Sequence, residues 1–400
     1  MFGGRQRRRG ALAATALLAA VLAAPAAAGA GATHKSTMTD LGTLPGGTDS
    51  FATAINAHGQ VTGNAVAAGG AQHAFRWTRS GGMRDLGTLP DGTFSRGTGI
   101  NARGLVAGNA GLSEGTQHAF RWTDTGGMRD LGTLPGGRNS FVPQELGPAV
   151  NAGGQVIGTA ETADRTQHAF RWTESGGMQD LGTLPGGSFS RATAINGPGQ
   201  VIGIGDTLGG AQHAFRWTES GGMQDLGTLP GGTFSQATAI NAHGEVAGNA
   251  GSAGSTQHAF RWTESGGMQD LGTLPGGTSV QATVINAHGQ IAGDAMTADG
   301  TVHAFRWTEG GGLEDLGTLP GGTSSEAAAI NAHGQIAGQA RTVDGIFHAF
   351  RWTESGGMED LGTLPGGAGS FGSGINARGQ VAGGSFLVAE GALHAVLWTP

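Results

Sequence analysis

A pattern of about 45 residues recurs eight times along this 400-residue chain and constrains its fold more than any other feature. Each copy contains Asp-Leu-Gly-Thr-Leu-Pro, then Ile-Asn-x-x-Gly-x-Val-x-Gly, then His-Ala-Phe-Arg-Trp-Thr, with small departures. All tryptophans of the chain fall in the last motif, 45, 50, 45, 45, 45, 45 and 46 residues apart: Trp77, Trp122, Trp172, Trp217, Trp262, Trp307, Trp352 and Trp398. A fixed period near 45 is typical of a four-stranded β-propeller blade.

The fifth copy shows how one repeat divides into four short strands. Ala237–Asn241 and Glu245–Asn249 are small and alternating, and Gly244 between them suits a turn that needs positive φ. His258–Thr263 places His, Phe and Trp on one face and Ala, Arg and Thr on the other. Met268–Leu274 is the expected fourth strand, ended by a Pro-Gly-Gly sequence because proline cannot donate to a ladder.

Side-chain size increases from the first two strands of each repeat to the last two. Alanine, glycine and valine dominate the first pair, whereas Phe, Trp, Met and Leu lie in the second. Propeller blades need this gradient, because they converge at the ring axis and diverge outside. A sandwich of similar strands has no reason for it. The 80 glycines also disfavour long helices, and they lack the every-third-residue spacing of collagen.

The two ends of the repeat array predict how the ring closes. The array begins with a fourth-strand motif, Met38–Leu44, and finishes with a third-strand motif, His394–Thr399. The closing blade is therefore expected to combine one N-terminal strand with three C-terminal ones, which removes the open edges of an unclosed array. We predict an all-β, eight-bladed β-propeller spanning residues 38–400.

The residues before the array have the pattern of a secretory signal peptide, residues 1–30, followed by a short linker, 31–37. Arg5–Arg9 supply a basic region, and Ala11–Ala24 is too short an apolar stretch to span a bilayer. We expect cleavage near Gly29 or Gly31 and export to the extracellular space or periplasm. An uncleaved anchor is the alternative, and the residues leave open whether export uses the general or the twin-arginine route.

Charge and composition exclude several partner and site classes. Without the four N-terminal arginines, 18 basic residues face 29 acidic ones, which argues against nucleic acid. Cysteine is absent, so disulfides, thiolate metal sites and cysteine nucleophiles are excluded. No second apolar run follows the signal, so we expect no membrane contact after cleavage and a monomer.

The motifs His-Ala-Phe-Arg-Trp, Asp-Leu-Gly-Thr-Leu and Ile-Asn-x-x-Gly closely resemble the bacterial "HAF" extracellular repeat family. The resemblance covers about Met38 to Trp398, with Val396-Leu397 in place of Phe-Arg in the last copy and Val150 in place of Ile in the third. It implies an exported bacterial protein. It brings no assigned activity and no catalytic residues.

Repeated polar residues are candidates for chemistry, but their repetition favours structural roles. Equivalent histidines of neighbouring blades lie roughly 45° apart, beyond the ~2 Å ligand distances of one Zn²⁺ ion. We expect each His to hydrogen-bond the repeated Asp of a fourth strand, such as Asp270, and that Asp to cap a turn. The Arg row, Arg76 and its equivalents, is expected to pair with local acids rather than bind anions. We find no polar constellation confined to one blade, and expect no catalytic residues, metal or cofactor.

Function is expected to depend on loop variation. The second-to-third and fourth-to-first loops emerge on one face, and the repeats differ most there. The five extra residues of the third copy fall in Arg138–Pro148, assigned to a fourth-to-first loop, and the extra residue of the last copy lies between Gly383 and His394. We predict a non-catalytic propeller that binds a protein or glycan through this face, with these candidate contacts: Arg138, Phe141, Gln144 and Glu145. The alternatives are a glycan hydrolase or lyase using the channel, and a purely structural matrix protein.

Overall fold

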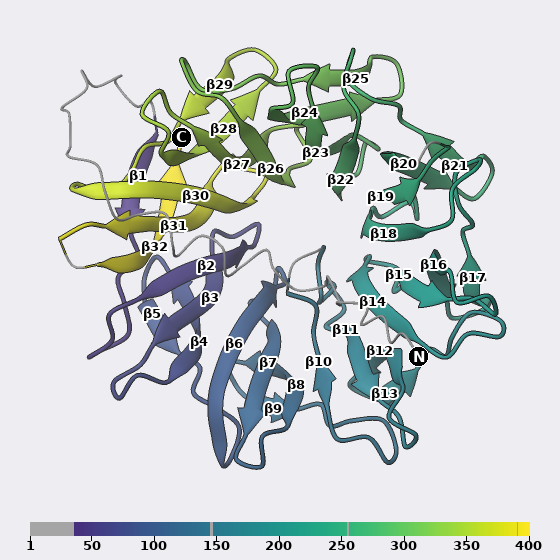
Figure 1. Ribbon diagram of the computed structural model, residues 1–400. Coiled ribbons are helices and arrows are strands. Elements are labelled where there is room, and N and C mark those ends of the chain that lie inside the picture. The colour runs from purple at the N-terminus through teal and green to yellow at the C-terminus, as the bar shows by residue number, and fades with distance from the viewer. Residues whose placement is uncertain (1–35, 145–146, 254–255, 390) are drawn as a thin grey trace, which may run out of the picture. The chain divides into compact units, whose positions relative to one another are not determined.

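The computed structural model describes residues 36–144, 147–253, 256–389 and 391–400. These residues form eight four-stranded antiparallel sheets that follow one another around a ring (Figure 1), and they contain no helix. The prediction of an all-β, eight-bladed propeller is confirmed. The segment interpreted as a signal peptide, residues 1–30, lies outside the described residues.

Blades 1 to 8 are numbered by their first strands, which lie innermost in the ring: β2 (Ser50–Ile55), β6 (Gly92–Ile100), β10 (Ser140–Phe141), β14 (Ser190–Ile195), β18 (Ser235–Ile240), β22 (Val280–Ile285), β26 (Ser325–Ile330) and β30 (Gly367–Ile375). The second strands are β3 (Val61–Val66), β7 (Val106–Leu112), β11 (Val156–Glu161), β15 (Val201–Asp206), β19 (Val246–Gly251), β23 (Ile291–Met296), β27 (Ile336–Arg341) and β31 (Val381–Leu387).

The third strands are β4 (Gln72–Thr78), β8 (Gln117–Thr123), β12 (Gln167–Thr173), β16 (Gln212–Thr218), β20 (Gln257–Thr263), β24 (Val302–Thr308), β28 (Phe347–Thr353) and β32 (Ala392–Thr399). The outermost, fourth strands are β5 (Gly82–Asp85), β9 (Gly127–Asp130), β13 (Gly177–Asp180), β17 (Gly222–Asp225), β21 (Gly267–Asp270), β25 (Gly312–Asp315), β29 (Gly357–Asp360) and β1 (Thr37–Asp40).

Blade 8 closes the ring as the sequence predicts. Its sheet has the order β1-β32-β31-β30, so the strand nearest the N-terminus is the outer strand of the last blade. Thr37 pairs with Thr399, and Asp40 pairs with Val396, in an antiparallel register. In Figure 1, β1 (purple) lies beside the yellow strands of the C-terminal end.

The fourth strands are shorter than predicted. In blade 5 the strand ends at Asp270, whereas the sequence pattern suggested an end at Leu274. The Asp270 carboxylate accepts a hydrogen bond from the Gly272 amide (2.8 Å), and Gly272 has a φ of 76°, so the chain turns out of the sheet there. Leu271 and Leu274 then enter the core between blades 5 and 6. The apolar pattern is therefore correct, but it belongs to a packed connection.

Each described core cluster lies between two neighbouring blades. Between blades 5 and 6, the aromatic side chains Phe305 and Trp307 of β24 pack with Leu271 and Leu274 and with the alanines of blade 5, such as Ala259. Phe305 is fully buried, and Trp307 is 4% exposed. Small inner strands and large outer side chains thus fill a wedge-shaped gap, which confirms the predicted gradient.

Candidate functional site

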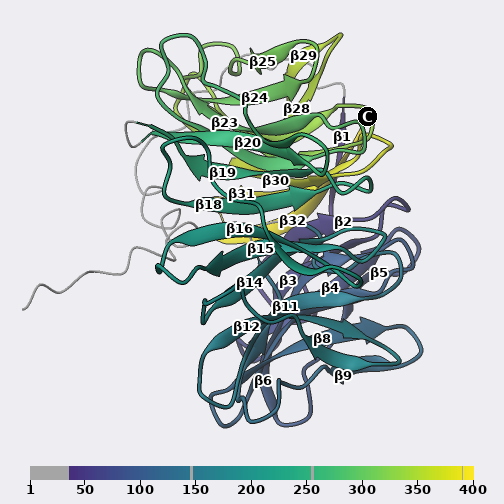
Figure 2. The same cartoon turned by 90° about the vertical axis from the view of Figure 1, so that its right-hand side faces the viewer.

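The propeller presents two faces with different loops. Strands run between the two faces, as the edge-on view indicates (Figure 2). In each antiparallel blade the second-to-third and fourth-to-first loops emerge at one end of the strands, and we call this end the variable face. The first-to-second and third-to-fourth turns emerge at the other end, which we call the constant face. The loops of the variable face touch one another, since the Gly186 segment lies against Leu208.

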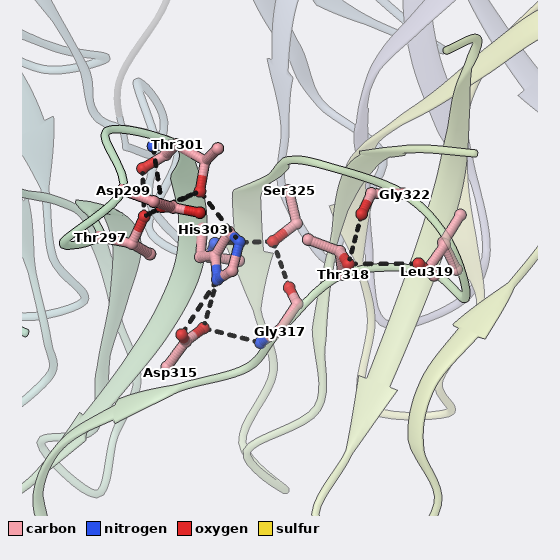
Figure 3. A network of polar contacts seen from close by, with 11 residues as sticks. Thr297, Asp299, Thr301, His303, Asp315, Gly317, Thr318, Leu319, Gly322 and Ser325 are labelled. Carbon is pink, nitrogen blue, oxygen red and sulfur yellow. Dashed lines mark hydrogen bonds and ion pairs between the residues drawn. The ribbon is translucent and has the colours of Figure 1, made fainter. Parts of the chain in front are cut away.

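A polar network organises the second-to-third hairpin in blades 3 and 6, and Figure 3 shows it in blade 6. The Asp299 carboxylate accepts hydrogen bonds from the hydroxyls of Thr297 and Thr301 across the tip of the loop. These two bonds lower the pKa of Asp299 to about 2. The loop is thus held by its own side chains.

One histidine–aspartate pair in every blade ties the third strand to the fourth. In blade 6, His303 Nδ1 lies 3.0 Å from the Asp315 carboxylate, which also accepts a 2.8 Å hydrogen bond from the Gly317 amide. The predicted hydrogen bond and the predicted turn cap are both confirmed. The other pairs are His73–Asp85, His118–Asp130, His168–Asp180, His213–Asp225, His258–Asp270, His348–Asp360 and His394–Asp40.

This network resembles a nucleophile–base–acid triad but lacks a free nucleophile. His303 Nε2 lies 3.4 Å from the Thr301 hydroxyl, and its other ring nitrogen contacts Asp315. However, the Thr301 hydroxyl donates its proton to Asp299, so His303 has no proton to accept from it. In blade 2 the hydrogen bond to Asp130 raises the pKa of His118. The histidines therefore act as structural cross-links.

The insertion of the third copy departs from its expected position. β10 (Ser140–Phe141) already pairs with β11 before the extra residues begin, and Val150 resumes the pairing with Val156. The other seven first strands carry a register shift at this place, as between Ala192 and Ala194 of β14. The insertion therefore interrupts the innermost strand of blade 3. Its assignment to a fourth-to-first loop is wrong, because a strand that already bulges accommodates extra residues there.

The described end of the insertion packs against the neighbouring inner strands. The Pro148 carbonyl accepts a 3.0 Å hydrogen bond from the Ile195 amide of blade 4. A Cβ on Gly147 would lie 2.4 Å from the Ala194 Cβ and 3.3 Å from the Thr238 carbonyl of blade 5. These contacts place Gly147 and Pro148 against the innermost strands of blades 4 and 5.

The four predicted contact residues differ in position and exposure. Arg138 is exposed in the connection before β10, Phe141 is half-buried at the end of β10, and Gln144 is exposed within the insertion. Glu145 lies outside the described residues. The extra residue of the last copy falls in the segment that forms the β31–β32 hairpin, on the variable face as predicted.

Exposed apolar side chains gather on the variable face, a feature that the sequence analysis missed. All five large apolar side chains that are exposed in the described part of the chain lie in its loops: Leu208 (84% exposed), Val343 (73%), Val388 (66%), Ile346 (39%) and Phe234 (37%). Leu208, Val343 and Val388 occupy one position of the repeat, which holds alanine or serine in the other copies. A comparison of copies at this position would have found them.

The β27–β28 and β31–β32 hairpins of blades 7 and 8 carry a set of apolar residues that we call the apolar patch: Val343, Ile346, Phe347, Phe386, Leu387 and Val388. A Cβ on Gly369 would lie 3.5 Å from Ile346 and 3.8 Å from Phe386, so side chains of the two blades converge there. Blade 3 instead has Ala163, Thr166 and Gln167 where blade 7 has Val343, Ile346 and Phe347.

The constant face is bound together by a ring of asparagines. Asn241 donates from Nδ2 to the Asn286 carbonyl of the next blade, while its Oδ1 accepts from the His243 and Glu245 amides. The same side-chain-to-carbonyl bond links all eight blades: Asn56 to Asn101, Asn101 to Asn151, Asn151 to Asn196, Asn196 to Asn241, Asn286 to Asn331, Asn331 to Asn376 and Asn376 to Asn56. The repeated Asn is therefore structural.

The arginine row links neighbouring blades as well. Arg76 makes two hydrogen bonds to Asp124 of blade 2 (2.6 and 2.7 Å), and its guanidinium lies 4.8 Å from the centre of the Trp122 ring. The expected pairing with acids is confirmed. Arg351 of blade 7 pairs with Glu359 of its own blade, and in blades 1 to 6 the arginine pairs with an acid of the next blade. The other pairs are Arg121–Glu174, Arg171–Glu219, Arg216–Glu264, Arg261–Glu309 and Arg306–Glu354.

Blade 5 contains one irregular feature on the constant face. Glu245 takes a place that holds glutamine in six copies and leucine in one, and it forms an ion pair with Arg261. Arg261 also lies 3.6 Å from Glu309 of blade 6. A pocket of about 510 Å³ opens here, lined by His243, Gly244, Glu245, Arg261, Thr263, Glu264, Ser265 and Glu309. Its lining comes from blade 5 and from Glu309 of blade 6, and Glu245 is the lining residue that the other copies do not share.

No group of three or more His, Asp or Glu side chains in residues 36–144, 147–253, 256–389 and 391–400 is placed to hold a metal ion. The same residues contain no helix long and apolar enough to cross a membrane.

Comparison with known proteins identifies the fold alone. No family model and no curated protein matches the sequence. The β-propeller domain of the Trilobed protease from Pyrococcus furiosus, described as having an open velcro topology, is 9% identical, with a TM-score of 0.50 over 77% of this chain and 94% of that one. One of two prolyl endopeptidases is 10% identical, with a TM-score of 0.54 over 78% of this chain and 49% of that one. The chain is thus similar to known propellers, and it spans about half the length of that endopeptidase.

Proposed function

We propose that this chain is a non-catalytic binding protein that holds a protein partner on the variable face of its propeller, at the apolar patch. The proposal rests on the exposure of Val343 and Val388 at loop tips where other copies have alanine or serine. Monomeric soluble proteins seldom expose contiguous apolar patches unless these take part in binding. Nothing in the packing of the blades requires large side chains there, because the smaller residues of the other copies serve equally well.

The chemistry of the patch favours a protein partner over a glycan. Its most exposed members, Val343 and Val388, are β-branched aliphatic residues. Apolar side chains of a protein partner gain from burial against such groups, whereas carbohydrate rings need hydroxyl-recognising polar groups. Arg341 stacks over Phe347 at 4.4 Å and supplies a cation at the rim. An apolar centre with a polar rim is the usual anatomy of a protein interface.

The repeated polar side chains support a binding role because they are already engaged in contacts that hold the fold together. The histidines, arginines and asparagines are occupied by contacts within and between blades, such as His303 with Asp315, Arg76 with Asp124, and Asn241 with Asn286. Groups that stabilise a fold in this way are not free to activate a substrate. Export, membership of the HAF-repeat family and the monomeric state remain part of the proposal, and N-terminal sequencing of secreted protein tests the first.

Placing a charge in the apolar patch should abolish partner binding. The double substitution Val343→Asp/Val388→Asp puts two carboxylates where apolar contact is proposed, so we expect at least about a hundredfold loss of affinity for the captured partner. The melting temperature should stay unchanged, because both side chains are largely exposed. Binding is measured by surface plasmon resonance with a partner first isolated by pull-down from the culture medium.

Matched variants show which face of the propeller binds the partner, and whether the partner contacts the apolar patch or the insertion of blade 3. Ala298→Asp lies at the equivalent loop tip of blade 6 and should bind normally. Arg138→Ala and Gln144→Ala test the contacts predicted from the sequence. If the patch variant binds normally while substitutions of the turn residues His243, His288 and His333 abolish binding, the partner uses the constant face. Retention of polysaccharide alone on a glycan array would instead support a lectin.

A further inference from the structure

In blades 2 and 5 an asparagine of the second strand clamps the blade to the next one. In blade 5, Asn249 accepts a 2.7 Å hydrogen bond from the Ala282 amide of blade 6 and donates a 3.2 Å bond to the Ala282 carbonyl. In blade 2, Asn109 makes the same two bonds to Val142 of blade 3, at 2.7 and 3.0 Å. A carboxamide can bind both groups of one residue because it carries an acceptor and a donor.

Blade 6 has an aspartate at this position. Asp294 accepts a 2.8 Å hydrogen bond from the Ala327 amide of blade 7, as Asn249 does from Ala282. Where Asn249 presents its donor nitrogen to the Ala282 carbonyl, Asp294 has a second carboxyl oxygen. That oxygen donates to the Ala327 carbonyl only when it carries a proton, because an ionised carboxylate is an acceptor alone.

The surroundings of Asp294 favour the protonated form. Its neighbours across the sheet are Gln281 of β22 and Ala304 of β24, and both are uncharged. Within the described residues, the charged group that acts on it is Glu326 of β26, which accepts a 2.8 Å hydrogen bond from Gln339. Burial first, and then the like charge of Glu326, raise the pKa of Asp294 to about 7, against the opposing effect of the Ala327 amide.

We propose that the joint between blades 6 and 7 is a pH-responsive clamp, in which protonated Asp294 holds both the amide and the carbonyl of Ala327 and the ionised side chain releases the joint. The device is local, since the joint between blades 5 and 6 has the same geometry with the non-ionising Asn249. Blade 7 also carries Val343 and Ile346 of the apolar patch.

The direction of the pH effect follows from linkage. A pKa raised from 3.8 to about 7 means that the folded joint binds the proton more tightly than an opened joint, in which Asp294 meets water. The contribution of this group to stability is therefore fully present below pH 4 and is lost as the pH rises through about 7. Opening of the joint becomes easier over the same interval.

Hydrogen–deuterium exchange of the full chain tests the clamp at single amides. After correction for the intrinsic exchange rate, the protection of the Ala327 amide should fall at least about tenfold more than that of the Ala282 amide between pH 5.5 and 8.5. Ala282 is an internal control, because all other titrating groups, the histidine–aspartate pairs included, are present in the same molecule. Equal pH dependence at the two amides would overturn the proposal.

Exchanging the two side chains provides the decisive comparison. Asp294→Asn recreates the clamp of blades 2 and 5, so it should fold normally and make the protection of Ala327 independent of pH. Asn249→Asp should transfer the pH dependence to Ala282. If Asp294→Asn keeps the wild-type pH dependence, the proposal is wrong. If Asn249→Asp does not fold, the comparison between wild type and Asp294→Asn still decides.

Discussion

A chain lacking Met38–Leu44 should aggregate or lose most of its thermal stability, because this segment completes blade 8. The deletion removes most of β1, whose residue Asp40 pairs with Val396 and forms the ion pair with His394. It also removes Leu41 and Leu44, which are 5% and 2% exposed in the core against blade 1. Losing two buried leucines with their strand costs roughly 5–10 kcal/mol, comparable with the whole stability of many domains.

Aggregation is expected because the deletion exposes β32 (Ala392–Thr399) as a long unpaired edge. Size-exclusion chromatography and differential scanning calorimetry of the deletion variant measure both effects. As a control, Met38–Leu44 attached after Thr399 through a Glu-Ser-Gly-Gly turn, in a chain beginning at Pro45, should restore the melting temperature. A deletion variant that remains monomeric and melts at the wild-type temperature would show that the ring does not depend on this strand.

The architecture was predictable because it repeats. Each of the eight copies carries its own evidence for strand order and side-chain size, so a local pattern such as His258–Thr263 suffices to place Phe260 and Trp262 on one face. The closing strand is predictable because the array begins with a fourth-strand motif at Met38 and ends with a third-strand motif at His394. The end of the fourth strand was missed because Leu271–Leu274 has an apolar pattern that suits a strand and a packed connection equally.

The contacts between blades were not predictable from one repeat. Arg76 binds Asp124 of the next blade, and Asn241 binds the Asn286 carbonyl, so both partners lie one copy away. Position in the sequence does not reveal which copy supplies the partner. The sequence favours a loop for the insertion after Phe141 because loops usually tolerate extra residues, but the bulge of the first strand offers a second place.

The candidate binding site emerged only where the copies differ. A residue present in all eight copies is explained by the fold, so it does not indicate where a partner binds. Val343, Ile346 and Glu245 break the pattern without a packing reason, and Asp294 breaks it at a joint that asparagine serves elsewhere. Differences between copies are therefore the informative part of this sequence.

Replacing the last glycine of the Ile-Asn-x-x-Gly-x-Val-x-Gly motif should destabilise the protein strongly, although its backbone conformation suits any residue. A Cβ on Gly248 would lie 2.2 Å from the Gln236 carbonyl of β18 and 2.5 Å from the Phe260 ring. The register shift between Ala237 and Ala239 accompanies this close approach of the strand backbones. Because such overpacking is destabilising, we expect Gly248→Ala to lower the free energy of unfolding by roughly 2–4 kcal/mol, measured by urea denaturation.

The matched control is Gly197→Ala in the first-to-second turn of blade 4. Nothing lies within 4 Å of the Cβ position at Gly197, and the other seven copies already have alanine there. We expect the stability to stay constant or rise by up to about 1 kcal/mol, because alanine reduces the freedom of the unfolded chain. If Gly248→Ala is as well tolerated as Gly197→Ala, the inner strands do not approach as closely as described.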